Sequence, residues 1–154
     1  MNAPNRTIEA FGYPDTVIHD SDSWLVMLRP KQATLGSLIL ACKEPAKSVS
    51  QLSQQATQAM PIAMRQCERL LEESFGQDKI NFLMLMMVDP HVHFHVLPRY
   101  REDREAGLPS LANTVFTDPG WPAAPRLDFA TATTAQQNAD LTTYLRNQWQ
   151  TISF

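Results

Sequence analysis

The chain has 154 residues, 44% of them apolar, a length that supports one buried core and leaves too little for two. With 13 lysines and arginines against 16 acidic residues, the formal charge of -3 excludes the overall basic surface of a general nucleic-acid binder. Residues 1–12 contain no apolar stretch of signal-peptide length, and no segment approaches the roughly 20 apolar residues of a membrane-spanning helix. We therefore expect one soluble, cytoplasmic domain with no nucleic-acid or membrane partner.

Two short strands are the first predicted elements, at residues 24–28 and 35–42. Each is an apolar run, and the polar, proline-containing turn at residues 29–32 joins them into a hairpin. Arg29 and Lys31 stand at the mouth of this turn. We expect both to bind phosphate or another anion, because arginine grips phosphate oxygens in a fork. The alternative is that they form a solvated basic turn.

A long helix is predicted after the hairpin, with Ser53 as its N-cap and Gly76 as its stop. Apolar residues recur at spacings of three and four along residues 60–75, as expected for one buried helical face. Pro61 lies inside this pattern and removes a backbone donor. We therefore expect either a kink at Pro61 or a helix that begins near Met60.

A second hairpin and a C-terminal helix complete the predicted elements. Residues 80–88 are almost continuously apolar, Asp89-Pro90 supplies a turn, and residues 91–97 alternate between histidine and apolar side chains. The charged and proline-rich stretch from residue 99 to residue 125 is predicted to be irregular. Apolar residues spaced by four, four and three predict an amphipathic helix near residues 135–152.

Three of the four histidines, His91, His93 and His95, occupy alternate positions of the second hairpin. Alternate side chains of a strand share one face, about 6.6 Å apart, so the outer pair lie about 13 Å apart. Zinc requires imidazole nitrogens at about 2.0 to 2.1 Å from one point, which three histidines on a straight strand do not easily provide. A row of imidazoles with this spacing suits a phosphate group, and neutral imidazole is a nucleophile. Two alternatives stay open: purely structural histidines, and a zinc site made from two of them and an outside ligand.

Residues 91–99, His-Val-His-Phe-His-Val-Leu-Pro-Arg, resemble the signature of the histidine-triad (HIT) superfamily. The resemblance extends more weakly over residues 20–100. It implies an α+β fold with an antiparallel sheet of about five strands and a packed helix, assembled as a homodimer. The additional C-terminal helix rests on the apolar spacing alone. We expect a histidine-triad domain at residues 10–125 and a C-terminal helical extension of the same domain at 126–154.

The resemblance also implies a chemistry. His93 is expected to attack the α-phosphate of a nucleoside phosphoramidate or dinucleoside polyphosphate, forming a covalent nucleotidyl-histidine that water or another acceptor resolves. His91 is expected to orient His93, and His95 to bind phosphate and help the leaving group. Asn81 resembles in position an amide that contacts phosphate in the family. The expected partner is a small-molecule nucleotide or phosphate ester, and no metal or other cofactor is expected.

Three positions depart from the family pattern and leave the substrate open. Ser37, which we expect to contact phosphate, stands where relatives often place a fourth histidine after the strand glycine. Arg29 stands where relatives tend to hold the ribose hydroxyls with a short acidic or amide side chain. The compact segment 86–90 replaces a glycine-rich loop before the triad. The sequence therefore predicts a nucleotidyl hydrolase or transferase, with a catalytically weak nucleotide- or phosphate-binding module as the alternative.

Overall fold

A five-stranded antiparallel sheet lies at the centre of the structure, a computed structural model that describes residues 3–154. Its strands follow the spatial order β1-β2-β3-β5-β4, so β5 is an inner strand and β4 an edge strand. The predicted α+β class is confirmed. The strands span β1 Val17–Asp20, β2 Trp24–Leu28, β3 Leu38–Cys42, β4 Lys79–Leu83 and β5 His93–Arg99.

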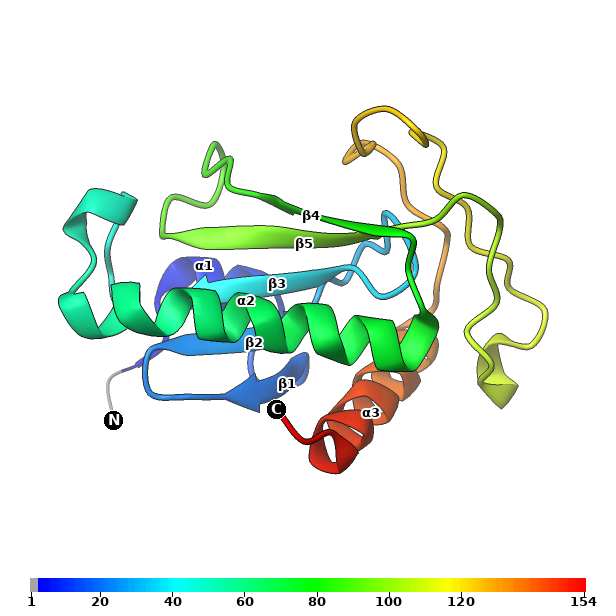
Figure 1. Ribbon diagram of the computed structural model, residues 1–154, viewed down its shortest axis with the longest axis horizontal. Coiled ribbons are helices and arrows are strands. Elements are labelled where there is room, and N and C mark those ends of the chain that lie inside the picture. The colour runs from blue at the N-terminus through cyan, green and yellow to red at the C-terminus, as the bar shows by residue number, and fades with distance from the viewer. Residues whose placement is uncertain (1–2) are drawn as a thin grey trace.

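Helices cover both faces and one edge of this sheet. Figure 1 shows α2 across one face and the short α1 on the other, with α3 beside the edge strand β1. Two short 3-10 turns complete the regular elements, and none of the helices in residues 3–154 is long and apolar enough to cross a membrane. The helices span α1 Arg6–Ala10, α2 Gln54–Phe75 and α3 Ala135–Thr151, and the turns η1 Val49–Gln51 and η2 Pro109–Leu111.

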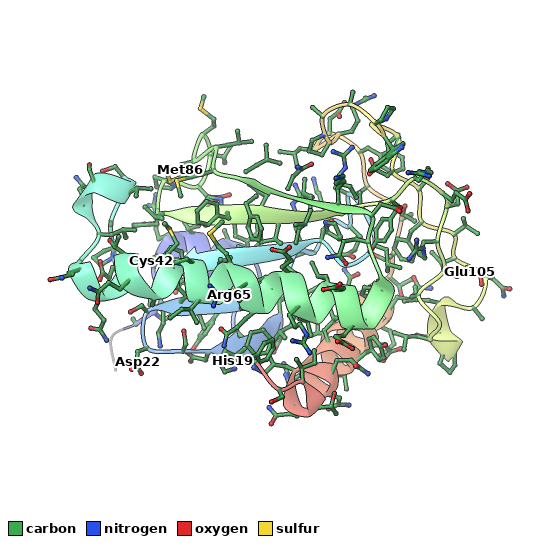
Figure 2. All side chains as sticks on the ribbon, viewed as in Figure 1. His19, Asp22, Cys42, Arg65, Met86 and Glu105 are labelled. Carbon is green, nitrogen blue, oxygen red and sulfur yellow. The ribbon has the colours of Figure 1, made fainter. Side chains whose placement is uncertain are left out.

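Strands β2 and β3 are buried on both faces, which explains why their sequences are continuously apolar. One set of alternate residues joins the large core beneath α2, where Cys42 lies at the end of β3 (Figure 2). The other set faces α1 and comprises Leu25, Met27, Ile39 and Ala41. Because Ile39 pairs with His95 and Ala41 with His93, both histidines point to the α1 face.

Helix α2 begins at Gln54 and passes through Pro61. The expectation that it begins near Met60 is wrong, because Ser53 caps the earlier start: its side chain accepts a hydrogen bond from the Ala56 amide. Gly76 ends the helix in the left-handed conformation, with φ 62°, as the predicted stop.

The second hairpin is shorter than its sequence predicts. Strand β4 ends at Leu83, and β5 begins at His93, two residues later than expected. The loop between them, residues 84–92, contains Met86 with a positive φ of 51° (Figure 2). The alternation of apolar and histidine residues therefore predicted the strand but placed its start two residues too early.

Candidate active site at the histidine row

His93 and His95 form the centre of the site. Their ring centroids lie 5.1 Å apart and the rings meet edge to face. His91 lies in the bend before β5, although the chain there still follows the sheet, because the Val92 carbonyl accepts a hydrogen bond from the Cys42 amide at 3.0 Å. The structure therefore brings the three predicted histidines together, two on the strand and one just before it.

The imidazole of His93 is held in one tautomer by the backbone. Its Nδ1 lies 2.7 Å from the carbonyl oxygen of His91. A carbonyl oxygen only accepts hydrogen bonds, so Nδ1 carries the proton and Nε2 keeps its lone pair. His91 thus orients His93 through its main chain, and the ring of His93 presents a nucleophilic nitrogen.

The imidazole of His95 is held in the complementary way by Arg29. The Arg29 Nε donates to His95 Nδ1 at 3.2 Å. Because a guanidinium is always a donor, Nδ1 of His95 is the acceptor and the proton of its neutral ring sits on Nε2. Burial, together with the charges of Arg29 and His93, lowers the pKa of His95 to about 4. His95 is therefore a neutral hydrogen-bond donor at pH 7.

The imidazole of His91 is attached to helix α1. Its Nδ1 lies 3.0 Å from the hydroxyl of Thr7, and its backbone amide donates to the same hydroxyl at 3.1 Å. Burial lowers the pKa of His91, and the positive charges of Lys47 and Arg6 lower it further. No sequence pattern in residues 1–12 pointed to this contact.

Phe11, which follows α1, covers the histidine row. Its ring centroid lies 5.4 Å from that of His93 and 6.0 Å from that of His95. Ile8 of α1 packs beside it on the buried strands β2 and β3. This cover explains why His93 is only 1% exposed. Sequence analysis missed Phe11 because a single aromatic residue after a five-residue helix gives no periodic signal.

The basic turn before β3 contributes one of its two predicted residues to the row. Arg29 reaches His95, whereas the side chain of Lys31 is exposed and only its carbonyl oxygen takes part, accepting from Arg29 Nη1 at 2.6 Å. Ser37 is fully buried, and its hydroxyl donates to the Thr34 carbonyl at 2.7 Å. The predicted phosphate contact of Ser37 is therefore corrected: its hydroxyl closes the loop before β3.

Asn81 lies on the same sheet face as the histidines but farther along β4. It pairs with Leu97, while Leu83 is the residue opposite His95. Its Oδ1 accepts from Arg99 Nη1 at 2.8 Å, and Arg99 is itself ion-paired with the buried Asp118 at 2.7 Å. The carboxamide of Asn81 is thus engaged by Arg99, and the structure shows no hydrogen bond between it and the histidines.

The histidine row was also compared with the ligand set that a metal ion requires. Residues 3–154 contain no group of three or more histidine, cysteine, aspartate or glutamate side chains placed to hold an ion. Nδ1 of both strand histidines is already engaged, by the His91 carbonyl and by Arg29. The arrangement thus leaves Nε2 of each ring for other chemistry.

An antiparallel sheet that carries alternating histidines on an inner strand defines the histidine-triad class of proteins. The model of the HIT domain matches residues 11–102, and the chain belongs to the HIT family. The HIT family belongs to a superfamily of nucleotide-binding and hydrolase-type proteins. No curated protein sequence matches the chain.

Solved structures of histidine-triad proteins share the fold. A histidine triad protein from Marinobacter aquaeolei VT8 is 19% identical, with a TM-score of 0.72 over 99% of both chains. One from Sinorhizobium meliloti 1021 is 18% identical, with a TM-score of 0.70 over 95% of this chain and 96% of its own. A hypothetical histidine triad nucleotide-binding protein from Sulfolobus tokodaii strain7 is 12% identical, with a TM-score of 0.64 over 88% of this chain and 83% of its own. At these identities the likeness establishes the fold.

Proposed function

We propose that the protein is a nucleotidyl hydrolase or transferase in which His93 Nε2 attacks the α-phosphorus of a nucleotide substrate. The observation that carries this proposal is the 2.7 Å hydrogen bond between His93 Nδ1 and the His91 carbonyl. It leaves the lone pair on Nε2, and it stabilises the positive charge that develops on the ring when that lone pair forms a bond.

The reaction proceeds in two displacements. In the first, the Nε2 lone pair of His93 forms an N–P bond, and the bond from phosphorus to the leaving group breaks with its electron pair on the leaving atom. In the second, the oxygen of water or of another acceptor forms a bond to phosphorus, the N–P electrons return to Nε2, and the acceptor's proton passes to solvent. His95 donates a hydrogen bond from its Nε2–H group to a phosphate oxygen in both displacements and keeps its proton.

The experiment measures turnover and the covalent intermediate together. Wild-type protein is incubated with adenosine phosphoramidate and with diadenosine polyphosphates, and released adenosine monophosphate is measured by chromatography. Intact mass spectrometry then detects the added nucleotidyl group. We expect His93→Ala to abolish both signals, while His19→Ala, which alters the one histidine outside the row, retains them. Turnover that survives in His93→Ala contradicts the proposal.

A nucleotide-binding module without turnover is the second candidate, favoured by the burial of His93. With Phe11 over the row, only 1% of His93 is exposed. This candidate predicts that calorimetry detects adenosine monophosphate binding, that His95→Ala removes it, and that no substrate is converted. Product formation by wild-type protein excludes it.

We further propose that the protein assembles as a homodimer through the edge strand β4. Within the described structure, β4 pairs only with β5, so its other edge presents unpaired backbone donors and acceptors. The adjoining loop exposes two large apolar side chains, Met87 at 87% and Val88 at 90%. A second copy of β4 satisfies the edge and covers these side chains.

A further inference from the structure

Two buried arginines lie near the site face of the sheet, and they differ in what neutralises them. Arg99 is 4% exposed and is held by both carboxylate oxygens of Asp118, at 2.7 and 3.1 Å. Arg29 is 8% exposed, yet it forms no ion pair with any carboxylate in residues 3–154. Burial of an uncompensated guanidinium is costly, so a residue in this position is suited to a ligand that supplies the negative charge.

The hydrogen bonds of Arg29 engage Nε and Nη1 of its guanidinium group but not Nη2. Nε donates to His95 and Nη1 donates to the Lys31 carbonyl, while Nη2 has no acceptor in residues 3–154. Burial also lowers the pKa of the Arg29 guanidinium. The open Nη2 therefore lies at the His95 end of the histidine row and is available to an anion there.

The charge around the row is positive at both ends, although the whole chain carries a net charge of -3. Arg29 lies at the His95 end. At the other end, Arg6 and Lys47 both act on His91 through their charge. This pattern fits a substrate with several negative charges along the row better than one with a single phosphate.

The Arg29 contact also decides what His95 does for the leaving group. With Nδ1 engaged by Arg29, the only ring proton of His95 is the Nε2 hydrogen of a neutral imidazole. That hydrogen makes a hydrogen bond, but its transfer would produce an imidazolate anion. An amine leaving group requires a proton as its bond to phosphorus breaks, whereas a phosphate leaving group departs as an anion without one.

We infer that Arg29 is an anion subsite for the leaving group and that the site selects phosphoanhydrides over phosphoramidates. When the N–P bond to His93 forms, the P–O bond to the bridging oxygen breaks and its electron pair stays on that oxygen. The departing phosphate is held by Arg29, and no proton from the protein is required. This inference rests on the proposed function, because it concerns the leaving group of the same reaction.

The test compares two substrates that share the adenosine 5′-phosphate group and differ in the leaving group. We measure kcat/KM for diadenosine tetraphosphate and for adenosine 5′-phosphoramidate with wild type and Arg29→Gln. Wild type is expected to prefer the tetraphosphate. Loss of a hydrogen bond between charged groups predicts that Arg29→Gln lowers kcat/KM for the tetraphosphate by about 10- to 100-fold more than for the phosphoramidate.

Two further variants serve as controls for the effect of Arg29→Gln. Arg29→Lys keeps the charge and is expected to retain part of the preference even if Arg29→Gln folds poorly. Arg69→Gln, on the exposed surface of α2, removes a charge away from the row and is expected to change neither rate. Equal loss on both substrates in Arg29→Gln overturns the inference, because it shows that Arg29 acts only on His95 or on the shared phosphate. A wild-type preference for the phosphoramidate overturns it as well.

Failure of the proposed function gives a different result. If wild type turns over neither substrate, the subsite is tested by calorimetry with inorganic pyrophosphate. Binding to wild type that Arg29→Gln loses and His93→Ala keeps supports the anion subsite without catalysis. Equal binding to wild type and Arg29→Gln, or no binding to wild type, overturns it.

Discussion

The ring of Phe11 lies 5.4 Å from the ring of His93, whose side chain is almost completely buried. The cover is attached by hydrogen bonds as well as by packing. Thr7 bonds to His91, and the Asn5 side chain donates to the Cys42 carbonyl at 3.2 Å. Because the proposed reaction requires substrate to reach the buried imidazole of His93, we expect this short helix and Phe11 to move when substrate binds.

Removal of the Phe11 ring is therefore expected to expose His93. Phe11→Ala should speed ethoxycarbonylation of His93 by diethyl pyrocarbonate, measured by peptide mass spectrometry, because the phenyl ring no longer packs beside the imidazole. Phe82→Ala is the matched control, since Phe82 packs against Phe94 on the opposite face of the sheet. Equal acceleration in both variants would mean that general loosening, and not the cover, controls access.

Acidification is expected to destabilise the fold between about pH 6.5 and pH 4. The folded-state pKa of His95 is lowered, chiefly by burial, to about 4 from 6.5. In that window the unfolded chain binds a proton that the folded chain does not, so stability is present above pH 6.5 and falls as the pH decreases. Burial also lowers the pKa values of His91 and His19, which act in the same direction.

Thermal unfolding at a series of pH values measures this effect. The unfolding midpoint of wild type should decrease from pH 7 to pH 4. His95→Gln should show a shallower decrease, because it lacks one of the three histidines whose pKa is lowered in the folded state. Carboxylates contribute to the acid limb in both proteins, so the difference between the two curves is the informative quantity. Parallel curves would contradict the assignment to His95.

The alternation of histidine and apolar residues in 91–97 was sufficient to predict a strand whose histidines share one face. The period of two is a local property, so it survives without knowledge of the rest of the fold. The start of β5 was not predictable in this way. It depends on where β3 ends and on the backbone of Ala46, which accepts from Val92 at 2.9 Å.

The partners of the row lie far from it in sequence. Thr7 contacts His91 across 84 positions, and Arg29 contacts His95 across 66. The sequence marked Arg29 as an anion ligand but gave no reason to expect its bond to an imidazole. Asn81 lies on a strand, as predicted, but its side chain is hydrogen-bonded to Arg99. The ion-pair partner of Arg99, Asp118, lies in the stretch that the sequence predicts only to be irregular.

The buried pair of Arg99 and Asp118 is expected to be the strongest attachment of that irregular stretch to the sheet. Asp118→Asn removes the charge but keeps the size, and leaves Arg99 buried without a counter-charge, which should cost about 3 to 5 kcal/mol in the free energy of unfolding. Urea denaturation measures this cost. Asp128→Asn is the control, because its pair with Arg126 is exposed and the unfolding midpoint should stay unchanged. Similar midpoints for both variants would show that the buried pair is not a principal attachment.

The proposed homodimer makes the exposed hairpin loop sensitive to charge. Val88→Asp, alone or with Met87→Asp, places carboxylates where the partner's edge strand is expected to pack, and desolvation of unpaired charges at an interface is unfavourable. Light scattering coupled to size-exclusion chromatography should report a dimer for wild type and a monomer for the variants. Ile62→Asp, on the solvent side of α2, is the matched control: Ile62 is also exposed, at 52%, but lies away from β4. If wild type is monomeric, or if Ile62→Asp dissociates the dimer while the loop variants do not, the interface does not run along β4.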